Sequence, residues 1–423
     1  MGLVMRFLIA FVALALAVSG WLAWPLYGYA AHAGEAPLLP FGWIDMPREH
    51  PTTEMVLDPR FAAAGAQTLA AMEAHRDEID APGFSAAVAI GGEVVWQGAV
   101  GWADLARGEA VTPETIFRIG STSKAVTGAA LARLVDQGTI DLDAPIERYL
   151  HDLPNPEWAG ITPRMLASHT AGLPHYGDND DRKGWYHSGA LVAHYDNVHN
   201  ALELFDDSTL LFEPGTDFEY SSYGTVLLGA VIADAADLSY RELVTREVFA
   251  PAGMRSTIVA PKRHGKPEDL ARFYLVDSEN DRARPWRPVD LSHRLPGGGW
   301  ASTPTDLVRM GAMMLDDGYI SAATRDEMWT PVPLANGEVN EQDYALGWRW
   351  RAWEEEGFVV MRNANHGGVS RGSQCWLVVY PDFDMAIAYT INTRTEGFRP
   401  FGAFLPKIAV PFGQAVLAQQ DEG

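Results

Sequence analysis

Two hairpin-like patterns lie near opposite ends of the chain. Residues 84–100 form two apolar runs around Gly91-Gly92, a pattern typical of a β-hairpin. Residues 372–392 repeat this arrangement around a turn that begins at Pro381. We therefore expect one antiparallel sheet that is built from both ends of the chain.

Helical periodicity dominates the sequence between these hairpins and also flanks them. The segments with apolar residues at helical spacing are 59–78, 123–137, 223–236, 305–315 and 398–417. Pro406 and Pro411 must interrupt or kink the last of them. The pattern predicts an α/β (α+β) fold, in which helices flank the sheet and a largely helical region, about 115–310, is inserted. A cleft between the two parts is the expected place for a small-molecule site.

The N-terminal segment lacks charge from Phe7 to Ala31, which is long enough to cross a bilayer. This run closes with four aromatic residues suited to a membrane interface, Trp21, Trp24, Tyr27 and Tyr29. Ala31-His32-Ala33 also fits a signal-peptidase site. Residues 1–33 are thus expected to be a signal peptide or a membrane anchor.

Either interpretation predicts export, with the protein periplasmic or membrane-anchored and facing the non-cytoplasmic side. Residues 34–56 are rich in Pro and Gly and are predicted to be a linker. Residues 57–418 are then the main domain. The oligomeric state is left open.

Composition excludes several classes of function. The net charge of −23, from 55 acidic and 32 basic residues, disfavours nucleic acid as a partner. Cys375 is the only cysteine, so no intrachain disulfide forms, and its apolar surroundings predict a buried thiol. The 12 histidines include no HExxH pattern, and we expect no metal.

The segment that leads into the helix at 123–137 contains Ser121 and, three residues later, Lys124. Residues three apart share one face of a helix, so the lysine amine can reach the serine hydroxyl. The helix N-terminus favours a neutral amine and a developing oxyanion, and burial lowers the pKa of a lysine. Of five lysines, this one begins an apolar helix. A nucleophilic serine with a lysine base is the prediction, and an ordinary first-turn lysine is the alternative.

Four further segments follow Ser121-x-x-Lys124 in a fixed order. They are Ser168-His169-Thr170-Ala171-Gly172-Leu173, Pro214-Gly215-x-x-Phe218-x-Tyr220-Ser221-Ser222, Pro296-Gly297-Gly298-Gly299 with Ser302-Thr303, and His366-Gly367-Gly368. With them the chain resembles, over about residues 60–415, the serine β-lactamase-related superfamily. That superfamily contains class C β-lactamases, D-alanyl-D-alanine carboxypeptidases, and esterase and peptidase relatives. Segments 168–176, 212–224 and 328–333 resemble in particular the mitochondrial serine β-lactamase-like protein and its bacterial relatives.

The resemblance implies roles for individual residues. Ser121 is the expected nucleophile, with Lys124 and Tyr220 as its proton-handling partners. A phenol of pKa about 10 acts as a base near neutral pH only beside positive charge, which Lys124 would provide. The backbone N–H groups of Ser121 and Val369 are the expected oxyanion hole. No metal or organic cofactor is implied.

Two departures from the family's motifs concern the substrate. The common Lys-Thr-Gly motif is His366-Gly367-Gly368 here, and Ser222 replaces the Asn of Tyr-x-Asn. In lactamases the lost Lys and Asn help to position the substrate carboxylate and amide. We expect His366 to face the cleft and to change charge near pH 6.5; the alternative is that it only caps a turn and hydrogen-bonds the backbone. Arg371 either substitutes for the missing cation or is solvated. The predicted substrate-binding residues are Ser222, His366, Gly367, Gly368, Val369 and Arg371.

These expectations define two functional hypotheses. The first is a serine hydrolase that forms an acyl-enzyme with a peptide or ester substrate at the cell envelope. Peptidase or esterase activity is favoured over true β-lactamase activity because of the two departures. The alternative is a catalytically weak, membrane-tethered binding or scaffold protein that retains the fold.

Overall fold

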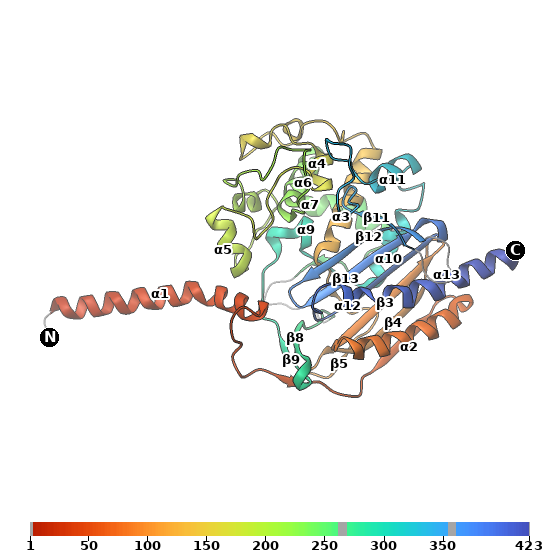
Figure 1. Cartoon of the computed structure of the whole chain (residues 1–423), viewed down its shortest axis with the longest axis horizontal. Helices are drawn as coiled ribbons and strands as arrows, with labels where there is room; N and C mark the ends of the chain where they lie inside the picture. Colours follow the sequence, from red (N-terminus) through yellow and green to blue (C-terminus); the bar gives the residue numbers. More distant parts are fainter. Residues whose placement is uncertain (1–2, 261–268, 354–360, 423) are drawn as a thin grey trace.

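The computed structural model describes residues 3–260, 269–353 and 361–422, and its centre is an eight-stranded antiparallel sheet (Figure 1). The strands follow the order β11-β12-β13-β14-β3-β4-β2, and β5 pairs with β4. Their bounds are β2 (Thr52–Val56), β3 (Gly83–Ile90), β4 (Glu93–Asp104), β5 (Glu109–Ala110), β11 (Arg349–Trp353), β12 (Met361–Ser370), β13 (Ser373–Tyr380) and β14 (Met385–Ile391). Both predicted hairpins are confirmed as β3–β4 and β13–β14. Strand β14 pairs with β3, with Ala388 opposite Ala87, so the two ends of the chain meet in one sheet.

Helices cover both faces of this sheet, which confirms the predicted α+β fold. The helices are α1 (Leu3–Ala33), α2 (Ala62–Glu78), α3 (Ser123–Asp136), α4 (Pro163–Ser168), α5 (Arg182–Ala190), α6 (Ser222–Ala235), α7 (Tyr240–Val244), α8 (Ala250–Ala252), α9 (Leu295–Gly298), α10 (Pro304–Met313), α11 (Ala322–Trp329), α12 (Arg399–Gly402) and α13 (Leu405–Glu422). Helices α2, α12 and α13 pack on one face through an aromatic core that includes Phe84, Tyr389 and Phe404. Helix α10 packs on the other face, against β3 and β14.

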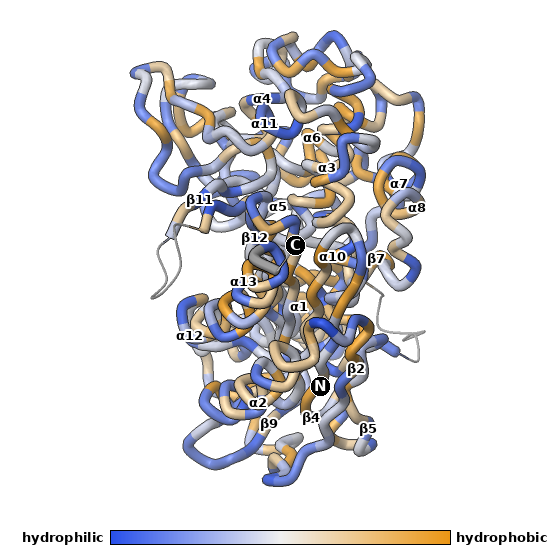
Figure 2. Tube along the Cα trace, turned by 90° about the vertical axis from the view of Figure 1, so that its right-hand side faces the viewer, coloured by the Kyte–Doolittle hydropathy of each residue, from blue (hydrophilic) through white to orange (hydrophobic). Residues whose placement is uncertain are grey.

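The inserted region packs around α3, whose residues are buried on nearly every side. Figure 2 shows hydrophobic residues along α3 and α6 in the interior and hydrophilic ones in the outer loops. The region is less purely helical than predicted, because it also holds short strands. These are β6 (Phe117–Arg118), β7 (Ile258–Val259), β8 (Tyr274–Asp277), β9 (Arg282–Pro285) and β10 (Trp300–Ser302). Residues 261–268 of the predicted region lie outside the described residues. Since α3 begins beside the sheet, its first residues lie at the junction between the two parts.

The predicted linker 34–56 is partly incorporated into the fold. Residues 44–45 form β1, which pairs with β9, and residues 52–56 form β2, the edge strand on β4. The β-branched residues Thr52, Thr53 and Val56 suit such a strand, and the Pro and Gly content around them hides this signal.

Among the residues that the structure describes, two helical segments are long and apolar enough to cross a membrane, Val4–Ala33 and Arg399–Gln420. In the most apolar stretch of the second segment, half of the residues are buried. Ile408 and Phe412 of α13 lie in the core under the sheet. The first, within α1, projects away from the body of the protein (Figure 1). It therefore remains the candidate signal peptide or anchor.

Candidate active site

Ser121 lies in a tight turn that begins at Gly120 and leads into α3. Gly120 has φ +52°, in the left-handed region, and a Cβ at this position would lie 2.6 Å from the Val369 carbonyl oxygen. A glycine is required for both reasons. The turn brings the backbone of Val369 in β12 alongside Ser121, consistent with the oxyanion-hole prediction, which stays a prediction.

Lys124, in the first turn of α3, is 1% exposed and lies directly behind Ser121. Its Nζ donates hydrogen bonds to Ser222 Oγ at 2.9 Å, to the Gly297 carbonyl at 2.8 Å and to Ser121 Oγ at 3.4 Å. Burial lowers the pKa of Lys124 to about 7, with a further contribution from the charge of Arg349. A substantial fraction of the amine is therefore neutral near pH 7, as a general base requires.

Tyr220 lies beside both residues, just before α6. The Lys124 Nζ is 4.7 Å from the centre of its ring, and its side chain forms a hydrogen bond with Ser121. Burial raises the pKa of Tyr220 above its ordinary value, although Arg349 and the Ser121 hydrogen bond act in the opposite direction. The expectation of a phenolate stabilised by a charged lysine is thus revised. In the resting protein Tyr220 is a neutral phenol, and Lys124 is the group that can accept a proton.

Ser222, the first residue of α6, joins this group through its hydroxyl, which accepts the hydrogen bond from Lys124. Its backbone N–H donates to His175 Nδ1 at 3.2 Å, so that nitrogen carries no proton. Burial lowers the pKa of His175 to about 3, and the ring is neutral in the working pH range. Sequence reasoning did not select His175, although it lies inside the 168–176 segment that carried part of the resemblance.

His366 does not occupy the predicted position. Its side chain is 0% exposed, its Nδ1 donates to the Gly367 carbonyl at 2.8 Å, and its Nε2 accepts from the Tyr344 hydroxyl at 2.8 Å. Burial, reinforced by the charges of Arg349 and Lys124, lowers its pKa well below the ordinary value. The expectation that His366 faces the cleft and titrates between pH 6 and 8 is wrong, because the ring is fixed as a buried neutral tautomer.

The residues that follow His366 have two different roles: the two glycines allow close packing, and the residues after them line the cavity. A Cβ on Gly367 would lie 2.5 Å from the Phe398 ring, and one on Gly368 would lie 1.9 Å from the Ile119 carbonyl oxygen. Gly368 therefore lets β12 approach the serine turn, whereas Gly367 packs against Phe398. Val369 and Arg371 line the cavity in front of Ser121.

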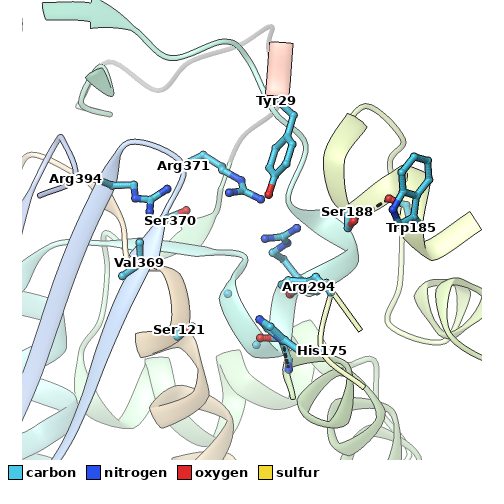
Figure 3. Close-up of a pocket in the computed structure, with 15 residues that line it drawn as sticks. Tyr29, Ser121, His175, Trp185, Ser188, Arg294, Val369, Ser370, Arg371 and Arg394 are labelled. Atoms are coloured by element: carbon cyan, nitrogen blue, oxygen red, sulfur yellow. Dashed lines mark hydrogen bonds between the residues drawn. The ribbon is translucent and has the colours of Figure 1, made fainter. Parts of the chain in front are cut away.

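This cavity has a volume of about 490 Å³ (Figure 3). Besides Ser121 and Ser222 it is lined by His175, by the backbone of α9 at Gly297, and by Arg294. Gly297 and Arg294 lie in or next to the predicted Pro296-Gly297-Gly298-Gly299 segment. Tyr29, which also lines the cavity, was predicted only as a residue of the membrane interface, and nothing in the sequence distinguishes Arg349, whose charge acts on Lys124.

The chain is similar to several known proteins over half of its length or more. The chain is 28% identical to the human serine beta-lactamase-like protein LACTB, mitochondrial, over 64% of this chain and 63% of that protein, so the match spans less than two thirds of the relative. It is 31% identical to a beta-lactamase of Escherichia coli strain K12, over 77% of this chain and 81% of that protein. It is 31% identical to esterase EstB of Burkholderia gladioli, over 52% of this chain and 61% of that protein.

A similar fold occurs in the octameric penicillin-binding protein homologue from Pyrococcus abyssi, with a TM-score of 0.66 and 23% identity over 82% of this chain and 77% of that one. The family model described as Beta-lactamase matches residues 69–406, which include every residue of the predicted catalytic and substrate-binding sets. Together with the serine turn and the buried lysine and tyrosine that contact Ser121, this match shows that the chain belongs to the beta-lactamase family.

Proposed function

We propose that this protein is a serine hydrolase that forms an acyl-enzyme through Ser121 and acts on a peptide or ester at the cell envelope. The observation that carries the proposal is the buried Lys124, whose Nζ lies 3.4 Å from Ser121 Oγ. Lys124, with a pKa of about 7, can take the proton of Ser121, and Ser121 lines a cavity that a substrate can enter. A base next to an accessible hydroxyl is what a nucleophilic serine requires.

The proposed reaction uses two proton-transfer groups. Ser121 Oγ attacks the substrate carbonyl carbon and gives its proton to neutral Lys124, while backbone N–H groups of Ser121 and Val369 receive the developing oxyanion. Tyr220, a phenol bonded to Ser121, donates a proton to the leaving group and is reprotonated from Lys124. Water then attacks the acyl carbon and gives its proton to the same pair; as the bond from the acyl carbon to Oγ breaks, the pair returns that proton to Ser121 Oγ and the acid leaves.

Esters or peptides are the proposed substrates rather than penicillins. Where lactamases have the Lys of Lys-Thr-Gly, this chain has the buried, neutral His366, so the cations near Ser121, such as Arg371, stand at other positions than the lysine that helps to place a lactam carboxylate. Ser222 uses its hydroxyl to accept from Lys124. We expect kcat/KM for a p-nitrophenyl ester to exceed that for nitrocefin by more than tenfold, as measured with the purified full chain. A tenfold preference for nitrocefin would contradict the proposed specificity.

We also propose that α1 directs the chain across a membrane, with residues after about 35 on the non-cytoplasmic side. Its apolar side chains are largely exposed, with Phe7 at 67% and Phe11 at 69%. An alkaline phosphatase fused at residue 50 should therefore be active in a bacterial host, and β-galactosidase fused at the same residue should be inactive. The reverse pattern of reporter activities would overturn this topology.

A further inference from the structure

The cavity in front of Ser121 is unusually basic for so acidic a chain. Arg294, Arg371 and Arg394 all line it, and no Asp or Glu of the described chain does so. Within the same described ranges, the arginines that form ion pairs with carboxylates do not include any of these three. A protein of net charge −23 thus holds three unneutralised cations at one place.

Two of these arginines are largely removed from water. Arg294 is 9% exposed, stacks on the Tyr176 ring at 4.2 Å, and leaves its Nη2 buried without a hydrogen-bond partner. The Nε of Arg371 is likewise buried without a hydrogen-bond partner. Burial, together with the charges of Arg294 and Arg394, lowers the pKa of Arg371 to about 10, so it stays cationic at neutral pH. Buried donors without partners, held beside like charges, form a ready site for an anion.

The N-terminal helix supplies the fourth member of this group. Tyr29 lines the cavity, and Arg371 Cζ lies 4.8 Å from the centre of its ring. Figure 3 shows the Tyr29 hydroxyl beside the Arg371 guanidinium, with the Arg294 guanidinium below it. The wall of the cavity is therefore complete only while α1 remains attached.

The last turns of α1 are packed into the body of the protein. Leu26 lies against Gly189 of α5, where a Cβ would be 3.0 Å from the leucine side chain, and the Tyr186 hydroxyl donates to the Leu22 carbonyl at 3.2 Å. Ala31, part of the possible cleavage site, is 4% exposed, and the His32 ring lies 4.6 Å from the Trp286 ring. These contacts make α1 a structural component of the site.

The exposed part of α1 has the length of a bilayer. Residues 4–24 rise about 31 Å at 1.5 Å per residue, against a hydrocarbon thickness of about 30 Å. Trp21 and Trp24 at the end of this part are 75% and 63% exposed, as expected at a membrane surface. Trp185 of α5, which lines the cavity, is also 59% exposed. A helix α1 that spans a bilayer would therefore bring the Trp185 side of the cavity close to the membrane surface.

We propose that Tyr29, Arg294, Arg371 and Arg394 form an anion-binding subsite next to Ser121 that takes the phosphate headgroup of an amphiphilic substrate in the membrane that holds α1. This inference deepens the proposed hydrolase function and rests on it. Guanidinium groups bind phosphate through paired charge-assisted hydrogen bonds, and Trp185 together with the apolar surface of α1 accommodates the acyl part.

Binding to the full-length Ser121→Ala variant tests the subsite without turnover. In non-ionic detergent, calorimetry should give dihexanoylphosphatidic acid a Kd at least tenfold lower than that of dihexanoylphosphatidylcholine. Arg371→Gln and Arg294→Gln should each raise the Kd of the anionic lipid about tenfold or more, and Arg371→Lys should recover part of the loss. Arg107→Gln, which removes an exposed arginine paired with Glu109, should change it less than twofold.

Two further variants, and inorganic phosphate as a second ligand, test the role of Tyr29 and the assignment to a membrane amphiphile. Tyr29→Ala should weaken binding of the anionic lipid. Tyr27→Phe should not, because Tyr27 is on the same helix but its hydroxyl donates a hydrogen bond to the Pro37 carbonyl. Equal affinity for the two lipids, or equal losses in the Arg107 and Arg371 variants, would overturn the subsite. Inorganic phosphate bound as tightly as the lipid would overturn the assignment to a membrane amphiphile. Because these measurements need no nucleophile, the separate failure of wild-type hydrolysis would count against the proposed function alone.

Discussion

Replacing Ser121 with alanine is expected to lower kcat for a p-nitrophenyl ester by about 10⁴- to 10⁶-fold, with KM changed much less. The substitution removes only the atom that attacks the carbonyl, and the surrounding turn keeps its shape because its backbone contacts Val369. Lys124 also keeps its two closer acceptors, Ser222 Oγ and the Gly297 carbonyl, so the buried amine stays satisfied. Steady-state kinetics on the purified variant measure the effect.

A matched control is Ser278→Ala, an exposed serine in the turn between β8 and β9. Its kcat should equal that of the wild type within experimental error. Ester hydrolysis by the Ser121 variant within tenfold of the wild-type rate would mean that another group carries the reaction.

Replacing Lys124 with methionine is expected to lower kcat/KM for the same neutral ester by about 10²- to 10⁴-fold, the usual contribution of a general base. The wild-type profile should rise with pH through about 7, because Lys124 is protonated below its lowered pKa and neutral above it. Burial keeps His175 and His366 neutral throughout this range, so they add no step. In the methionine variant the rise near pH 7 should disappear from the pH profile.

Two other substitutions test whether the loss of activity comes from the loss of a base at position 124. Lys124→Arg keeps the positive charge but cannot act as a base near pH 7, so it should lose activity as the methionine variant does. Lys183→Met removes a lysine that is 65% exposed and should leave both rate and profile unchanged. A pH step that persists without Lys124 would assign the base to a different residue.

The parts of the site that sequence reasoning found are local. Ser121 and Lys124 are three residues apart at the start of one helix, so helix geometry alone brings them together. The hairpins at both chain ends were equally predictable, because Gly91-Gly92 and the turn at Pro381 separate apolar runs. Tyr220 and Ser222 required the family resemblance, since nothing in their own segment points to Ser121.

The parts that it missed depend on distant packing. His366 is neutral because burial, reinforced by the charges of Arg349 and Lys124, lowers its pKa, and the hydroxyl of Tyr344, from the loop before β11, helps to fix its tautomer. The basic cavity combines Tyr29, Arg294 and Arg371, which come from the N-terminal helix, the segment before α9 and the turn after β12. An isolated arginine in a sequence carries no sign of which other charges it will meet, so this juxtaposition appears only in the folded chain.

The most direct test of the central claim is covalent labelling of the full-length protein with a fluorophosphonate, read by intact mass and peptide mapping. The proposed mechanism predicts one adduct per chain, located on Ser121, and no adduct on the Ser121→Ala variant under the same conditions. It also predicts slower labelling of the Lys124→Met variant, because the serine is then no longer activated. Undiminished labelling of the alanine variant, or an adduct on any other residue of the wild type, would contradict the assignment of Ser121 as the nucleophile.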